Sequence, residues 1–185
     1  MLGIGDRLPA FEVVGVKPGF NNVEQHGESA FETLTEKSFE GKWKVIFLYP
    51  KDFTFVCPTE IAEFAWLVND FAKRDAIVLG GSSDNEFVKL AWRRDHKDLD
   101  RLPIWQFADA KGDLIDGLGV RAPSGVAYRV TFVADPQNVI QHVYATNLDV
   151  GRAPQDTLRV LDALQTGSLC ACNRPVGGEV VTPAA

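Results

Sequence analysis

The sequence predicts one α/β domain, a sandwich with a mixed β-sheet, and two patterns predict it. Short apolar runs of the β type alternate with segments in which apolar residues follow helical spacing, an order typical of strands joined by crossover helices. Further along the chain, two β-type runs flank a short turn, which predicts a hairpin of antiparallel strands. The length of 185 residues and the apolar content of 45% suit one ordinary buried core.

The first predicted strand and helix surround a proline-rich junction. Residues 15–37 are rich in Gly, Asn and Glu, so we expect a loop or irregular ribbon there. The apolar run 44–49 predicts a central strand that Pro50 ends, because proline has no N–H to donate to a sheet. From Pro58 to Phe71 the apolar residues follow helical spacing, and proline is favourable in the first turn of a helix.

A second strand and helix follow the same order. Residues 76–80 form an apolar run that predicts another buried strand. Ser83 and Glu86 fit a capping box, which predicts that a helix begins there and continues through Arg94. Residues 104–107 predict a shorter strand. The carboxyl ends of such strands and the starts of their helices share one edge of the sheet, where α/β proteins tend to hold their sites.

The last third of the chain predicts a hairpin, a helix and a tail. Residues 129–134 and 139–144 flank a turn with proline at its second position. Pro154 starts a final amphipathic helix, and Gly167 ends it. We therefore expect a domain over residues 1–167 and a tail without periodic pattern over residues 168–185.

Charge and composition exclude several classes of partner and location. The net charge of −6 disfavours nucleic acid and acidic membrane surfaces as main partners. No apolar run reaches the roughly 18 residues that span a bilayer, and the N-terminus lacks the layout of a signal peptide. We therefore expect a cytoplasmic protein with reduced thiols. Because three cysteines make no disulfide framework, a disulfide between Cys57, Cys170 and Cys172 is expected to be transient and catalytic.

Cys57 is the strongest candidate for chemistry. It follows the predicted central strand and lies at the start of the predicted helix, whose partial positive charge and free N–H groups favour the nucleophilic thiolate. The Thr54 hydroxyl can donate to that thiolate, and Arg129 can bring a permanent cation to the same edge of the sheet. A buried and inert cysteine is the competing interpretation, since free cysteine is among the most buried residue types.

The residues around Cys57 resemble the signature of the peroxiredoxins, in the version of their typical two-cysteine, AhpC-type group. The matching run is PKDFTFVCPTE, from Pro50 to Glu60. The resemblance covers nearly the whole chain and includes Trp92, Gly119, Val120, residues 129–132 and residues 163–165. The ending Leu-Cys-Ala-Cys-Asn at residues 169–173 is especially similar to actinobacterial members of this group, the alkyl hydroperoxide reductase C proteins.

This resemblance implies a thioredoxin-like fold and a thiol-dependent peroxidase without metal or organic cofactor. Cys57 would be the peroxidatic residue, which attacks hydrogen peroxide, an organic hydroperoxide or peroxynitrite and becomes a sulfenic acid. Thr54, the Cys57 backbone N–H and Arg129 would stabilise the negative charge that develops. Pro50 would shield the thiolate from water, and Glu60 would orient the Arg129 guanidinium.

The resemblance also implies partners. Cys170 would be the resolving cysteine, supplied by the second subunit of a homodimer, and dimers would assemble into a ring, a decamer or a dodecamer. Cys172 can relay the disulfide outward or replace Cys170, and the sequence leaves both open. The reductant is also open: a small Cys-x-x-Cys protein of the AhpD kind, which the Leu-Cys-Ala-Cys ending favours, a thioredoxin-like protein or a flavoprotein disulfide reductase.

Two other functions remain open from the residues alone. A thioredoxin-like dithiol oxidoreductase needs Cys-x-x-Cys at the strand–helix junction, but Thr54 and Glu60 stand where the second cysteine would be. A non-enzymatic holdase or scaffold ring would be indifferent to Cys57→Ser. Elsewhere, the basic residues between 93 and 101 alternate with acids and are expected to form a solvated face. Lys89 departs from the histidine of many peroxiredoxins, and no function is attached to it.

Overall fold

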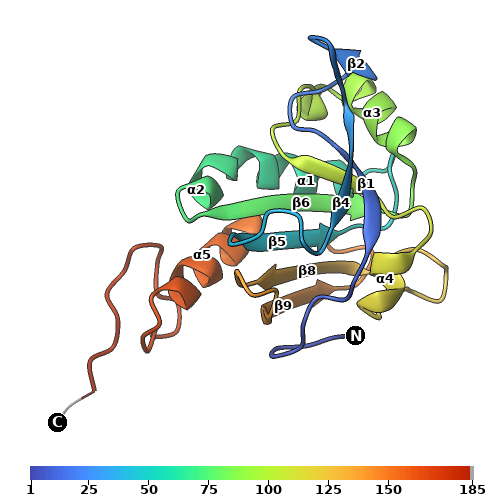
Figure 1. Ribbon diagram of the computed structural model, residues 1–185. Coiled ribbons are helices and arrows are strands. Elements are labelled where there is room, and N and C mark those ends of the chain that lie inside the picture. The colour runs from blue at the N-terminus through green and yellow to red at the C-terminus, as the bar shows by residue number, and fades with distance from the viewer. Residues whose placement is uncertain (184–185) are drawn as a thin grey trace.

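A computed structural model of the protein describes residues 1–183, which form a mixed β-sheet covered by helices on both faces (Figure 1). The seven strands of the sheet lie in the order β4-β1-β7-β6-β5-β8-β9. Strand β5 pairs in parallel with β6, and β6 in parallel with β7, whereas the other pairs are antiparallel. This arrangement confirms the predicted α/β sandwich with a mixed sheet.

The strands and helices have the following bounds, given in chain order. The strands are β1 (Glu12–Val16), β2 (Glu24–Gln25), β3 (Glu28–Ser29), β4 (Phe31–Thr35), β5 (Trp43–Leu48), β6 (Ala76–Ser82), β7 (Trp105–Ala108), β8 (Arg129–Ala134) and β9 (Ile140–Thr146). The helices are α1 (Cys57–Trp66), α2 (Val68–Ala72), α3 (Glu86–Asp95), α4 (Asp113–Gly117) and α5 (Pro154–Gln165), with a 3-10 turn at Lys97–Leu99.

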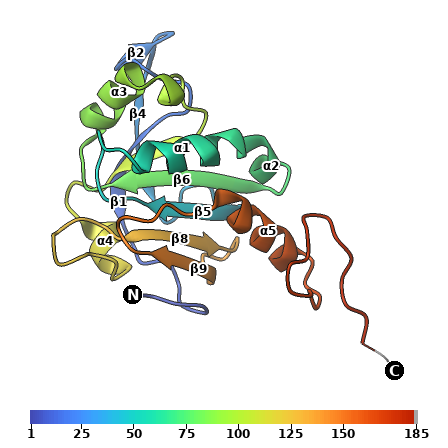
Figure 2. The ribbon, with the colours of Figure 1, turned by 180° about the vertical axis from the view of Figure 1, so that it is seen from behind.

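The central strand β5 divides the core into two layers. Its residues Val45 and Phe47 join the apolar cluster beneath α1, α2 and α5, while Ile46 and Leu48 join the cluster beneath α4. This alternation is the period of two expected for a strand that is buried on both faces. Figure 2 shows α1 and α2 over β6, with α5 beside them.

Two sequence predictions about secondary structure are wrong. Residues 15–37 are not the continuous loop or irregular ribbon that was predicted, because they include the end of β1 and all of β2, β3 and β4, although residues 17–23 lie outside any strand. Gly15 lies inside β1, where a Cβ atom would come within 2.6 Å of Leu34, so this glycine marks close packing and not a turn. The capping box is also absent: Asn85 caps α3 by accepting from the Val88 N–H at 3.0 Å.

The tail after α5 contains no helix or strand over residues 168–183, and the last two residues of the predicted tail lie outside the described part. Asp162 on α5 fastens the tail: its carboxylate accepts from Arg174 at 2.6 Å and from the Gly177 N–H at 2.9 Å. Within residues 1–183, no helix combines the length and the apolar character needed to cross a bilayer.

Candidate active site

Cys57 lies where the sequence predicts it, as the first residue of α1 after the loop that follows β5. It is 1% exposed, so the thiol is almost completely shielded from solvent. Val56, the residue before the helix, makes no side-chain cap. The partial positive charge of the helix N-terminus is therefore not satisfied by a capping side chain next to the sulfur.

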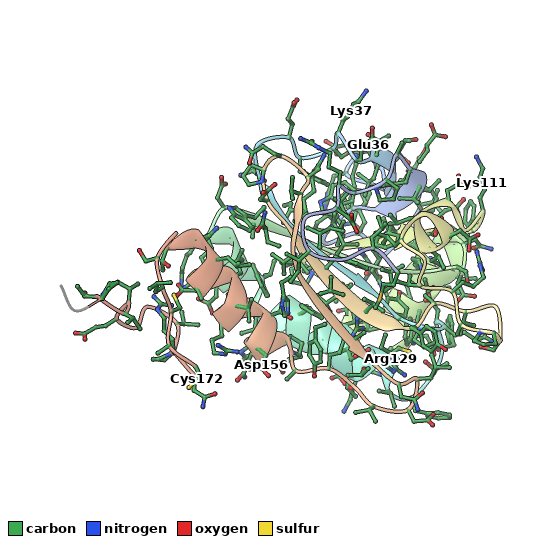
Figure 3. The ribbon with its side chains drawn as sticks, turned by 90° about the horizontal axis from the view of Figure 1, so that it is seen from below. Glu36, Lys37, Lys111, Arg129, Asp156 and Cys172 are labelled. Atoms are coloured by element: carbon green, nitrogen blue, oxygen red, sulfur yellow. The ribbon has the colours of Figure 1, made fainter. Side chains whose placement is uncertain are left out.

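Arg129 is brought to Cys57 from the start of β8. Its Nη1 atom lies 3.3 Å from the sulfur and donates to it, and the same nitrogen donates to Glu60 Oε2 at 2.8 Å. Its Nε donates to the Leu148 carbonyl at 2.6 Å, which fixes the guanidinium from the opposite side. The cation that the sequence predicts at this edge of the sheet is thus in direct contact with the sulfur. Figure 3 labels Arg129.

A second arginine that the sequence analysis missed completes this group. Arg152 immediately precedes the Ala153–Pro154 start of α5, and its side chain is fully buried. It donates to Glu60 Oε1 from Nε at 2.7 Å and from its backbone N–H at 2.8 Å, and to Oε2 from Nη2 at 3.0 Å. No local pattern distinguishes this arginine from a surface arginine, because only the tertiary fold carries it to α1.

Glu60 is therefore an ionised carboxylate between two arginines. Burial alone disfavours its charged form, but the hydrogen bonds and charge of Arg152, with the charge of Arg129, outweigh burial and lower the pKa of Glu60 below its ordinary value. A fixed carboxylate holds the planar guanidinium of Arg129 in one orientation. Glu60 and Arg129 are thus in direct contact, and the role of Glu60 in orienting Arg129 stays a prediction that this contact supports.

The loop residues Pro50 and Thr54 make no direct bond to the sulfur. The Thr54 hydroxyl donates its single hydrogen to the Lys51 carbonyl at 3.0 Å, so it is not donated to Cys57 here. Pro50 directly follows the buried Tyr49 and is itself half-buried. Both residues lie in the short segment between β5 and α1, directly before Cys57. The shielding expected of Pro50 and the donation expected of Thr54 stay predictions.

The tail cysteines lie beyond the far end of α5. Arg152 and Cys57 adjoin the N-terminal end of this helix, whereas Cys170 contacts Thr166 at its C-terminal end, with 3.4 Å between Oγ1 and Sγ. Twelve helical residues span about 18 Å. All three cysteines are free thiols, with Cys170 half-buried and Cys172 exposed. Figure 3 shows Cys172 beyond the end of α5 that points away from Arg129.

The predicted solvated face between residues 93 and 101 is wrong for Arg93. Its side chain is completely buried in α3, where Nε donates to Gln106 Oε1 at 2.7 Å. Its other nitrogens donate to the backbone carbonyls of Val16, Lys17, Phe20 and Ile104. Burial lowers the pKa of Arg93 to about 10. Arg93 is thus an internal brace between α3, β1 and the segment before β7.

Comparison with known proteins identifies the family. Residues 4–143 match the AhpC/TSA family. The chain belongs to the AhpC/TSA family. It is 48% identical over 183 residues to alkyl hydroperoxide reductase C of Mycolicibacterium smegmatis, which covers 98% of this chain and 94% of that protein.

Solved structures of this family share the fold. The structure of Mycobacterium tuberculosis AhpC is similar with a TM-score of 0.85 and 47% identity, covering 94% of this chain and 98% of that one. A 2-Cys peroxiredoxin of Plasmodium vivax has a TM-score of 0.85 and 27% identity, covering 95% and 91% of the two chains. The fold is thioredoxin-like, and this AhpC/TSA protein is a thiol-dependent peroxidase of the peroxiredoxin type, which confirms the predicted fold and enzyme class.

Proposed function

We propose that the protein reduces hydroperoxides by oxidation of Cys57, and that its substrates are hydrogen peroxide, organic hydroperoxides and peroxynitrite. The observation that carries this proposal is the 3.3 Å contact between the Cys57 sulfur and Arg129, a cation that Glu60 holds in place. A fixed donor next to a sulfur at a helix N-terminus stabilises the negative charge of the transition state.

The first step transfers one oxygen to sulfur. The Cys57 thiolate attacks an oxygen of the peroxide, the O–O bond breaks, and its electron pair leaves with the other oxygen. The leaving group is hydroxide or alkoxide, which takes up a proton, or nitrite when the substrate is peroxynitrite. Cys57 becomes a sulfenic acid. Arg129 stabilises the charge on the reacting atoms, and Glu60 orients Arg129. Thr54 turns its hydroxyl from the Lys51 carbonyl to the bound peroxide, and Pro50 keeps water away from the sulfur.

The second step forms a disulfide with the partner subunit. Cys170 contacts Thr166 at the C-terminal end of α5, whereas Arg152, which binds Glu60 one turn after Cys57, directly precedes the other end of that helix. Helix α5 is about 18 Å long, whereas Cα atoms in a disulfide are usually under 7 Å apart. This distance supports resolution by Cys170 of the partner in a homodimer, with loss of the sulfenic oxygen as water. The exposed Cys172 then relays the disulfide to a reductant.

The remaining proposals concern assembly and location. Dimers form a ring, a decamer or a dodecamer, in the cytoplasm, and the reductant is an AhpD-like protein, ahead of a thioredoxin-like protein or a flavoprotein disulfide reductase. The tail beginning at residue 168 acts as a separate mobile element of the cycle, distinct from the domain over residues 1–167.

A non-reducing gel after one equivalent of peroxide tests the two steps. Wild type is expected to form a disulfide-linked dimer, Cys170→Ser to lose most of it, and Cys172→Ser to keep it. Cys57→Ser is the decisive variant: if it still crosslinks at the wild-type rate, Cys57 is not the residue that peroxide oxidises. Mass spectrometry of the linked peptides distinguishes Cys57–Cys170 from Cys170–Cys172 pairing.

A further inference from the structure

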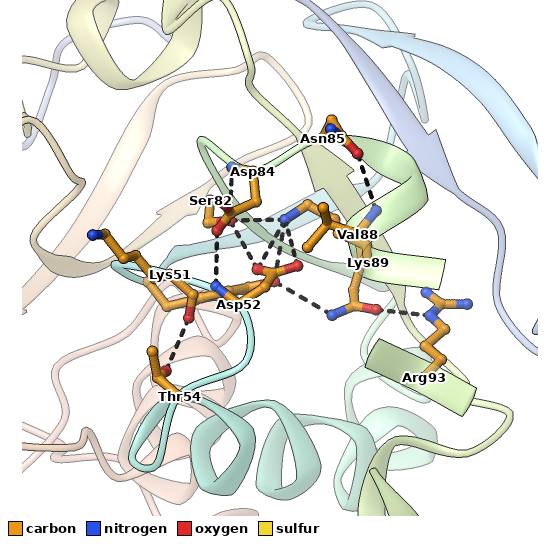
Figure 4. A network of polar contacts seen from close by, with 11 residues as sticks. Lys51, Asp52, Thr54, Ser82, Asp84, Asn85, Val88, Lys89 and Arg93 are labelled. Atoms are coloured by element: carbon orange, nitrogen blue, oxygen red, sulfur yellow. Dashed lines mark hydrogen bonds and ion pairs between the residues drawn. The ribbon is translucent and has the colours of Figure 1, made fainter. Parts of the chain in front are cut away.

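A buried lysine, Lys89, lies behind the loop that leads to Cys57. Its side chain is completely inaccessible, and its Nζ lies 3.2 and 3.3 Å from the two carboxylate oxygens of Asp52. It also donates to Ser82 Oγ at 2.8 Å, at the end of β6 (Figure 4). The mechanism proposed above does not use this ion pair.

Asp52 is the point at which the loop is anchored. Between Lys51 and Val56 it is the only buried residue. Its carboxylate accepts from Ser82 Oγ at 2.9 Å, and its backbone N–H donates to Asp84 Oδ2 at 2.8 Å. Asp52 is therefore bonded to both α3 and the end of β6, and Figure 4 shows these contacts converging on it.

Helix α3 also holds the next residue of the loop. Phe53 has a φ of 54°, a left-handed conformation that is uncommon outside glycine, and it stacks on Trp92 with ring centroids 5.7 Å apart. Trp92 follows Lys89 by one turn on the same helix. Two consecutive loop residues are thus held from α3, and Thr54 comes directly after them.

We infer that Lys89 is a positioning residue for Cys57 oxidation: its ion pair with Asp52 holds the loop in the shape that presents Thr54 and Cys57 to peroxide. This inference rests on the proposed oxidation of Cys57. Without Lys89, the Asp52 carboxylate is a buried charge without a compensating cation, and it moves toward water. The loop moves with it, because the backbone of Asp52 leads directly into Phe53 and Thr54.

The test measures the second-order rate constant for oxidation of Cys57 by hydrogen peroxide in a single turnover. Lys89→Met is expected to lower this constant about ten-fold or more, since small displacements of reacting groups have large effects on rate. Lys111→Met, an exposed lysine after β7, is the matched control and is expected to react like wild type. A wild-type rate in folded Lys89→Met overturns the inference.

A double mutant separates positioning from folding. Lys89→Met with Asp52→Asn leaves no unpaired buried charge, so it is expected to fold and to react at a rate between wild type and the single variants. The inference is wrong if the double mutant reacts at the wild-type rate. It is also wrong if the activation free energies that Lys89→Met and Asp52→Asn add separately sum to the increase in the double mutant. If Lys89→Met does not fold, the double mutant is compared with wild type alone, and a wild-type rate in the double mutant overturns the inference.

A second reagent shows whether the Cys57 thiol has become less reactive in general or whether only its reaction with peroxide has slowed. Alkylation of Cys57 by iodoacetamide is expected to stay at or above the wild-type rate in Lys89→Met, while oxidation by peroxide slows. If both reactions slow by the same factor, Lys89 does not position the peroxide site and the inference is overturned. Peroxide consumption by Cys57→Ser tests the proposed function separately. If consumption survives in that variant, the proposed function fails and removes the basis of the inference, whereas a wild-type rate in folded Lys89→Met overturns the inference alone.

Discussion

At the scale of single residues, Glu60 binds the two arginines of the site together. Its carboxylate accepts from Arg129 Nη1 at 2.8 Å and from Nε, Nη2 and the backbone N–H of Arg152. Removal of one partner from a buried ion pair typically costs about 3–5 kcal/mol. Arg152→Met is expected to lower the free energy of unfolding by up to about that amount, measured by urea denaturation, because Glu60 keeps Arg129 as its remaining cation.

The matched control for this variant is Arg159→Met on α5. Arg159 forms only a partly exposed pair with Asp156 at 3.5 Å, and such pairs contribute about 0–1 kcal/mol. Equal losses of stability in Arg152→Met and Arg159→Met would contradict the role of Arg152. The peroxide rate of Arg152→Met is also expected to fall, because Glu60 then holds Arg129 without its second partner.

The lowered pKa of Glu60 predicts a pH dependence of stability. Because this pKa is lower in the folded protein than its ordinary value of 4.5, the stabilisation is fully present above about pH 4.5. It is lost as pH falls further, through the pKa of the folded state. The difference in unfolding free energy between wild type and Glu60→Gln is therefore expected to shrink below pH 4.5, and a constant difference would contradict this.

Sequence reasoning found some site residues and missed others for a physical reason. Cys57 and Arg129 belong to local motifs, and the structure places them in contact. Arg152, Arg93 and Lys89 have no such signal, because the burial of a charged side chain depends on which carbonyls and carboxylates the tertiary fold brings to it. An arginine on an alternating charged segment looks exposed unless that fold is known.

At the scale of elements, Asp162 on α5 binds both the tail and the turn that follows α2. It accepts from Arg174 at 2.6 Å, from the Gly177 N–H at 2.9 Å and from Arg74 Nε at 2.9 Å. Burial opposes its ionisation, but these three donors lower its pKa to about 2. Asp162→Asn is expected to free the tail and to speed alkylation of Cys170 about five-fold or more, measured by mass spectrometry at neutral pH.

The control for the tail is Asp156→Asn, on the same helix but with only the exposed Arg159 contact. It is expected to leave alkylation of Cys170 unchanged. An Asp162→Asn protein whose Cys170 reacts at the wild-type rate would show that other contacts hold the tail. One such contact is the hydrogen bond from the Val181 N–H to the Leu169 carbonyl at 2.8 Å.

Element boundaries show where local rules are insufficient. The β8–β9 hairpin was predictable, because its turn at residues 135–138 has proline in a favourable position. β1 and β4 were not, because Gly15 suggests a loop unless its neighbour Leu34 is known. The start of α3 was misplaced because Ser83 and Asn85 are both good caps, and only the structure distinguishes them.

At the scale of the whole molecule, the alternation of strands and helices predicts the sandwich, but it does not predict how copies associate. Two large apolar side chains of the loop before Cys57 are exposed: Phe55 at 95% and Phe53 at 51%. Exposed aromatic residues in one segment favour contact with another protein surface. We expect this loop to take part in assembly of the proposed ring.

Phe55→Asp tests this assignment, because a charge at the centre of an apolar contact is costly to bury. The variant is expected to keep the fold, as Phe55 supports no buried contact at 95% exposure, and to sediment as a smaller species than wild type.

Trp66→Ser is the control, since this residue is 83% exposed at the opposite end of α1. Unchanged sedimentation of Phe55→Asp at low micromolar concentration, or an equal shift in Trp66→Ser, would place the interface elsewhere. A dimer that persists in Phe55→Asp and still forms the Cys57–Cys170 disulfide would separate ring assembly from the redox cycle.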